Sequence, residues 1–127
     1  MDKKLLIPVD IFDTDVEVVI NEDVVEALDK IDKENNDKNN KMIDHVNGFE
    51  EAFSYYCNQY KGGMIYKRVG MVVSPDVSET TLMHECLHTA WNIIEHKGVI
   101  IDWHNHEILC YLQGFLYAKI KVKLMKL

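Results

Sequence analysis

Residues 82–98 read LMHECLHTAWNIIEHKG and contain the pattern H-E-x-x-H. Apolar side chains recur in this stretch at intervals of three and four residues, which predicts a largely buried amphipathic helix. We expect the helix to begin at Ser74, a good capping residue that is followed by proline, and to end at Gly98. Because residues four apart lie on one face of a helix, His84 and His88 are expected to lie side by side.

The pattern H-E-x-x-H has the residue types that a zinc-dependent hydrolase needs. Two neutral imidazoles placed in this way can bind one Zn²⁺ at about 2.0–2.1 Å each. Glu85 lies about 100° further round the helix, where it can take a proton from a metal-bound water. We therefore predict that His84 and His88 are metal ligands and that Glu85 is the catalytic base. In a chain of this composition the pattern arises by chance in about 2% of cases.

A catalytic zinc ion also needs a third protein ligand, and Glu107 is the first choice. It stands near the start of a second, very apolar helix, which we expect from about residue 103 to residue 121. An extended segment over residues 98–104 is long enough to bring the start of that helix back beside the histidines. Three neighbouring polar residues remain alternatives to this glutamate: Asp102, His104 and His106.

The first half of the chain predicts a small β-sheet. Residues 4–10 and 15–20 have the composition of strands on either side of a turn. Residues 64–75 predict a further strand, interrupted near Gly70. Residues 52–58 fit either a strand or a short helix. Pro8 indicates that the first strand lies at an edge or carries a bulge.

Between these strands, a helix is expected to follow Asn21 and to fade into residues 35–48, an asparagine-rich stretch that we expect to be a mobile loop. The 127 residues are expected to be enough for a single hydrophobic core but not for two. We therefore predict a single α+β domain over residues 1–127, in which a small N-terminal β-sheet packs against the H-E-x-x-H helix and a second, C-terminal helix.

Charge and composition exclude several classes of function. The net charge is −7, and residues 1–51 alone carry −9, which argues against a nucleic-acid partner. No apolar run approaches the roughly 20 residues that cross a membrane, and the N-terminus does not have the composition of a signal peptide. Three cysteines without a C-x-x-C pair predict reduced thiols and a cytoplasmic protein. Two of them, Cys86 and Cys110, are expected in the core.

With these elements, the chain resembles the gluzincin metallopeptidases, and in particular a group of short, mostly phage-encoded H-E-x-x-H proteins. The resemblance rests on four segments: IPVDIFDTDVEVVI (7–20), GMVVSPD (70–76), HECLHTAWNIIEHKGV (84–99) and NHEILCYLQGFL (105–116). It implies a minimal zincin-like fold with zinc as cofactor, and the host cytoplasm as the location if the chain is phage-encoded. By analogy, the edge strand of the sheet binds an extended peptide substrate, and residues 70–74 border the cleft.

The chain departs from larger gluzincins in size, because it has no room for the second lobe that carries their substrate pockets and a tyrosine or histidine for the transition state. Tyr111 and His106 are the candidates for that role here, and Tyr111 could instead orient a zinc ligand or pack between helices. The sequence thus predicts a zinc-dependent hydrolase, most simply a peptidase acting on a peptide or protein. The alternative is a non-catalytic zinc-binding phage or bacterial protein that acts by binding a partner.

Overall fold

The computed structural model describes residues 2–127. Over this range a four-stranded mixed sheet, in the order β1-β2-β4-β3, combines with three α-helices and two short 3₁₀ helices. The strands are β1 (Lys3–Val9), β2 (Thr14–Ile20), β3 (Ala52–Lys61) and β4 (Met64–Val73). The helices are η1 (Asp10–Phe12), α1 (Val24–Asn35), η2 (Met42–His45), α2 (Glu79–His96) and α3 (Glu107–Met125). The predicted α+β class is confirmed.

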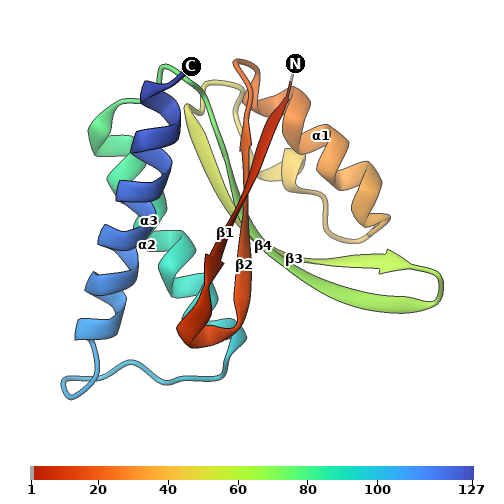
Figure 1. Ribbon diagram of the computed structural model, residues 1–127. Coiled ribbons are helices and arrows are strands. Elements are labelled where there is room, and N and C mark those ends of the chain that lie inside the picture. Colours follow the sequence, from red (N-terminus) through yellow and green to blue (C-terminus); the bar gives the residue numbers. More distant parts are fainter. Residues whose placement is uncertain (1) are drawn as a thin grey trace.

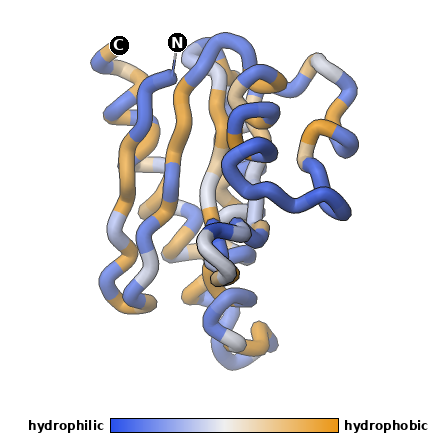
Figure 2. Tube along the Cα trace, turned by 90° about the vertical axis from the view of Figure 1, so that its right-hand side faces the viewer, coloured by the Kyte–Doolittle hydropathy of each residue, from blue (hydrophilic) through white to orange (hydrophobic). Residues whose placement is uncertain are grey.

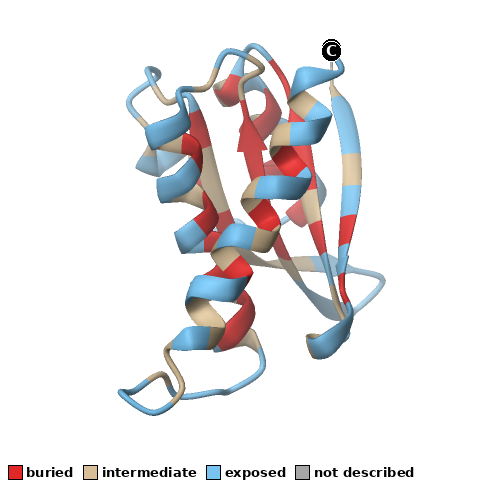
Figure 3. Ribbon diagram, turned by 60° about the vertical axis from the view of Figure 1, so that its left-hand side comes forward, coloured by how far each residue is buried: buried red, intermediate tan, exposed pale blue. Residues whose placement is uncertain are grey.

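The expectation of a single hydrophobic core is wrong, because the sheet is covered on both sides and separates two buried clusters. Figure 1 shows α1 on one side of the sheet and both α2 and α3 on the other. Side chains alternate along β2 as the period of a strand requires: Val16 and Val18 belong to the core beneath α2 and α3, and Val19 belongs to the core beneath α1. Figure 3 shows buried residues in red along the strands and on the sides of the helices that face the sheet.

The strands agree with the sequence prediction in all but one detail. Residues 3–9 form an edge strand that pairs only with β2, as Pro8 indicated, and residues 52–58 are part of a strand. The expected interruption at Gly70 is wrong, because β4 is continuous there. A side chain at this glycine would meet the carbonyl oxygen of Glu17 and the hydroxyl of Tyr55. The residue is therefore glycine because its neighbours approach closely.

Helix α2 starts later than predicted. Its N-cap is Ser78, whose hydroxyl accepts a hydrogen bond from the N–H of Thr81 at 3.2 Å. Ser74 instead continues the strand pairing, with its N–H donating to the carbonyl of Glu51 at 2.8 Å, and a turn follows it. The predicted stop is confirmed: Gly98 has φ +71° and donates its N–H to a carbonyl of the last helical turn.

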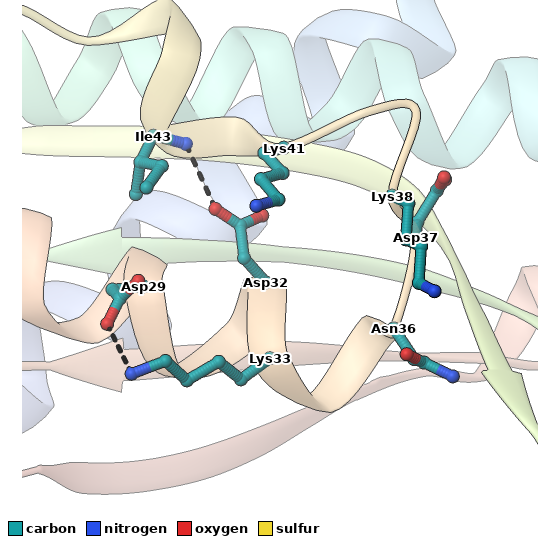
Figure 4. A pocket seen from close by; sticks show the side chains of 8 residues that line it. All are labelled: Asp29, Asp32, Lys33, Asn36, Asp37, Lys38, Lys41 and Ile43. Atoms are coloured by element: carbon teal, nitrogen blue, oxygen red, sulfur yellow. Dashed lines mark hydrogen bonds and ion pairs between the residues drawn. The ribbon is translucent and has the colours of Figure 1, made fainter.

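The segment that follows α1 is hydrophilic, as Figure 2 shows, yet it is attached to the body of the protein. The carboxylate of Asp32 accepts hydrogen bonds from the N–H groups of Met42 at 2.8 Å and Ile43 at 3.1 Å. These bonds, of which Figure 4 shows the one to Ile43, hold η2 against α1, and Met42 is buried. The mobility expected for residues 35–48 stays a prediction.

Helix α3 begins at Glu107 rather than near residue 103, because side-chain hydrogen bonds stabilise a turn in front of it. The amide of Asn105 donates to the carbonyl of Ile100 at 2.7 Å and accepts from the N–H of Asp102 at 2.8 Å. Such local bonds compete with helix formation. None of the helices in residues 2–127 is long and apolar enough to cross a membrane.

Candidate metal centre

Two histidines lie side by side on the exposed face of α2, as the spacing predicted. The Nε2 atoms of His84 and His88 are 3.0 Å apart, and the ring centroids are 4.6 Å apart at an angle of 70°. Two nitrogens bound to one tetrahedral zinc ion lie about 3.3 Å from each other. The donor atoms therefore converge with the separation that a shared metal ion needs.

Glu85 completes a group of three potential ligands. Its Oε1 atom accepts a hydrogen bond from the backbone N–H of Ser54 in β3 at 3.0 Å, and its Oε2 atom lies 3.8 Å from Nε2 of His84. The side chain is only 15% exposed, compared with 65% for that of His84. One carboxylate oxygen is thus fixed by the sheet, and the other is directed to the histidines.

Ser54 was not identified from the sequence. Besides holding Glu85 through its N–H, it donates its hydroxyl to the carbonyl of the same glutamate at 2.8 Å, and this hydroxyl lies 3.0 Å from that of the buried Thr89. Serine and glutamate are 31 positions apart in the chain, and no motif connects them. The contact depends on how β3 crosses α2, which local sequence patterns do not encode.

The strand beside the site is β3, and the expectation that residues 70–74 border the cleft is wrong. Residues 70–73 lie in β4, which pairs with β2 on one side and with β3 on the other. Its backbone groups are therefore used within the sheet. The edge strand β3 has one side outside the sheet, and on that side the N–H of Ser54 is bonded to Glu85 of α2.

Within residues 2–127, His84, Glu85 and His88 form the one group of three or more such side chains whose ligand atoms all lie within 4.8 Å of one another. Glu107 is not part of this group. Its side chain is 91% exposed, and its nearest ionic partner is His106, whose Nε2 atom is 3.9 Å away.

Figure 1 shows how the chain reaches Glu107. The segment between α2 and α3 runs across the lower ends of both helices, and α3 then runs back alongside α2. Helix α3 packs back along α2, where the amide of Gln113 donates to the carbonyl of Met83 at 3.0 Å, but Glu107 itself stays outside the ligand group. The role of Glu107 as a third ligand stays a prediction. The three alternative ligands also lie outside the group: Asp102, His104 and His106.

The remaining candidates near the site differ in their surroundings. Cys86 is fully buried, as expected, and burial together with the nearby charge of Glu85 raises the pKa of its thiol to about 12, so it is a core residue. Cys110 is exposed, which contradicts the prediction. The ring of Tyr111 is exposed and stacks on Phe115 with 6.2 Å between centroids. Its role towards a substrate stays a prediction.

A second polar cluster lies on the opposite side of the sheet, beside α1. The guanidinium of Arg68 donates to Glu17 at 2.8 Å and to Asn35 at 2.9 Å, and it forms an ion pair with Glu34 at 3.2 Å. The hydroxyl of Tyr55 also donates to Glu17, at 2.6 Å. Burial lowers the pKa of Arg68, but the hydrogen bond and charge of Glu17 outweigh it and raise that pKa overall. Burial, and then Glu17, raise the pKa of Tyr55.

In comparisons with known proteins, no family model, curated protein or solved structure matches the chain. The resemblance to gluzincins therefore stays a prediction that depends on the sequence segments quoted above. The chemistry of the site has to be argued from its own atoms.

Proposed function

We propose that this chain is a zincin-like, zinc-dependent hydrolase of minimal size, most simply a peptidase. The observation that carries the proposal is the convergence of two imidazole nitrogens and one carboxylate on the exposed face of a single helix. The separation of 3.0 Å between the Nε2 atoms suits a shared metal ion. The mixed sheet packed against this helix, with an edge strand beside it, supports the zincin-like part of the proposal.

Each residue of the group has a distinct role. The imidazoles of His84 and His88 would hold the ion, which when bound would supply a Lewis acid that acidifies water and polarises a carbonyl. Glu85 accepts a proton from a water at the site through Oε2, because Oε1 is kept in place by the N–H of Ser54. The same carboxyl group can return the proton to a leaving amine. Ser54 therefore orients the base through its backbone N–H.

The edge strand β3 supports a peptide or protein as the substrate. An extended peptide can add to a free strand edge through backbone hydrogen bonds, independently of its side chains. Strand β3 runs beside α2 at Ser54, where it contacts the catalytic base. A peptide lying along this strand would pass close to Glu85.

Zinc binding tests the first half of the proposal. Calorimetric titration of the metal-free protein with Zn²⁺, together with metal analysis, should give one ion per chain. His84→Ala and His88→Ala should each weaken binding by more than about 100-fold, because a lost ligand costs at least as much as a lost outer partner. His96→Ala is the matched control on the same helix, outside the ligand group. A protein that binds no stoichiometric zinc would exclude this function.

Turnover tests the second half. With a library of quenched fluorescent peptides as the probe, Glu85→Gln should keep zinc and lower the rate of hydrolysis by about 10²–10⁴-fold, the usual contribution of a general base. Glu95→Gln, an exposed change on the same helix, should leave the rate unchanged. If the protein binds zinc and Glu85→Gln alters none of its activities, a non-catalytic zinc protein that binds a partner is the correct description.

A further inference from the structure

The outer edge of β1 and the C-terminal half of α3 form a groove on the side of the sheet away from β3. Its volume is about 450 Å³. Figure 3 shows β1 at the edge of the sheet beside the part of α3 that leads to the C-terminus. The helix contributes two apolar and three basic side chains to the lining: Phe115, Val122, Lys119, Lys123 and Lys126. The strand contributes residues 5–8, and Asp10 lies at one end.

The pairing of β2 shows which backbone groups of β1 are free. Asn21, just after β2, donates its N–H to the carbonyl of Val73 in β4. Because backbone groups alternate in direction along a strand, those of residues 19, 17 and 15 also point to β4, and those of the residues between them point to β1. The residues facing β1 are 14, 16, 18 and 20, and their partners are residues 9, 7, 5 and 3. Lys4, Leu6 and Pro8 therefore direct their backbone groups outward, and proline, which has no N–H to offer, fits this position.

The groove thus presents a strand edge with regular polarity. Lys4 and Leu6 each offer one N–H and one carbonyl, and Pro8 offers a carbonyl. The side chain of Leu6 is 63% exposed. An unpaired edge of this kind is a template for one more strand, and proteins usually cover or charge such an edge.

The charge of the groove indicates what the added strand would carry. Lys119 and Lys123 are four residues apart on one face of α3, and Lys126, the C-cap residue, lies just beyond the end of the helix. Within residues 2–127 none of the three has a carboxylate within 4.0 Å, whereas Lys121, on another face, pairs with Glu79 at 3.2 Å. Lys119 lies over the ring of Phe115, 5.6 Å from its centroid, so it is placed by an aromatic neighbour and not by an acid. Three cations without an acidic partner beside a free strand edge favour a ligand with carboxylates.

We propose that this groove binds an extended, acidic segment of a partner protein, which adds to β1 as a fifth strand and places its carboxylates beside the three lysines. A second copy of this chain fits less well, because its own β1 would bring Lys3 and Lys4 against the same cations. The groove and the metal centre lie at opposite edges of the sheet, so the two functions are separable.

Amide exchange measured by NMR tests the backbone half of the proposal. The probe is a short synthetic peptide in which glutamate alternates with valine. In the free protein the amides of Lys4 and Leu6 should exchange quickly, and those of Leu5 and Ile7 slowly. With the peptide bound, the first two should slow by about tenfold or more. Leu6→Pro removes only an outward N–H and should weaken binding by about tenfold, whereas Leu6→Ala should not.

Charge reversal tests the other half. The triple variant Lys119→Glu, Lys123→Glu, Lys126→Glu should weaken peptide binding by at least about tenfold at low salt, and salt should reduce the difference. The matched control reverses three lysines beside α1, which Figure 4 shows: Lys33, Lys38 and Lys41. It makes the same change in net charge and should leave binding intact.

Several results would overturn the proposal. These are no binding of the glutamate–valine peptide, equal binding of its lysine–valine counterpart, equal weakening in both triple variants, or no added protection at Lys4 and Leu6. Self-association of the free protein through β1, seen as concentration-dependent sedimentation that Leu6→Pro abolishes, would identify a second copy as the occupant instead.

Discussion

The two polar clusters of this protein lie on opposite sides of the same sheet and differ in how completely they are satisfied. Beside α1, Arg68 reaches Glu17, Glu34 and Asn35, and Tyr55 reaches the same Glu17. Each charge in that cluster faces an opposite charge or a hydrogen-bond partner. On α2, two imidazole nitrogens approach each other, and one carboxylate oxygen has no hydrogen-bond donor from residues 2–127.

The difference indicates what each cluster contributes. A closed set of charges that satisfy one another contributes to stability and to a unique packing, and it offers no position to a ligand. An open set of donors on an exposed helix face contributes little to stability, and it gains partners only when something binds. The first cluster is therefore expected to respond to substitution with a loss of stability, and the second with a loss of binding.

The largest stability effect is expected at Arg68. Arg68→Met leaves Glu17 half-buried without its cation, and removal of one partner from such a pair costs about 3 kcal/mol of unfolding free energy. Zinc binding should not change. Urea denaturation measures the loss, and the double variant with Glu17→Gln should recover part of it because the uncompensated charge is gone. A single variant as stable as the parent would show that the closed cluster is not structural.

The next effect in size concerns the third ligand. If the first turn of α3 closes on the metal, Glu107→Gln should weaken zinc binding by about 10–100-fold while leaving the stability of the metal-free protein unchanged, because the side chain is 91% exposed. His104→Gln and His106→Gln are matched variants in the same segment. A loss confined to one of these histidines would transfer the ligand role to it, and unchanged affinity in all three would limit the protein ligands to α2.

The features that the sequence predicts correctly depend on local contacts, and those that it misses depend on contacts between distant residues. The H-E-x-x-H spacing, the edge position of Pro8 and the stop at Gly98 depend on neighbours a few residues away, and the structure has all three. Gly70 was misread as an interruption because its reason lies in distant residues. The helix begins after Ser78 and not at Ser74, because the N–H of Ser74 bonds to the carbonyl of the distant Glu51 and keeps this residue in the sheet.

The contacts within each cluster that join distant strands and helices could not be predicted from local sequence patterns. Arg68 and Glu17 are 51 positions apart, and Ser54 and Glu85 are 31 apart. Only the strand order brings them together. The later start of α3 has a more local cause, since the hydrogen bonds of Asn105 form a turn in the segment before the helix.

A smaller effect is expected at Ser54, where the open cluster joins the sheet. Ser54→Ala removes the hydroxyl contacts to Glu85 and Thr89 but keeps the backbone N–H, so it should cost about 1 kcal/mol of unfolding free energy. Zinc affinity should stay within about twofold, because neither imidazole depends on the hydroxyl. Ser54→Thr, which restores a hydroxyl, should recover the stability. A large loss of zinc affinity would mean that the open cluster is less independent of the fold than proposed.

The smallest expected effect is on the pH dependence of stability at His96, which is less exposed than the other two histidines of α2. Its Nδ1 atom lies 3.3 Å from the hydroxyl of Tyr56, and burial, followed by the charges of Lys97 and Lys67, lowers its pKa below the ordinary 6.5. The unfolded chain therefore takes up this proton first as the pH falls. The contribution of His96 to stability is complete above about pH 6.5 and is lost as the pH falls through that value towards the lower folded pKa.

His96→Gln should therefore reduce the drop in urea midpoint between about pH 7.5 and about pH 5.5. The change is expected to be small, because the residue is only partly buried. His45→Gln, at an exposed position in η2, is the control and should leave the drop as it is. If His96→Gln leaves the drop unchanged, the pH dependence comes from other groups. Partial burial would then not distinguish His96 from His84 and His88. The three histidines of α2 would differ only in their hydrogen-bond partners.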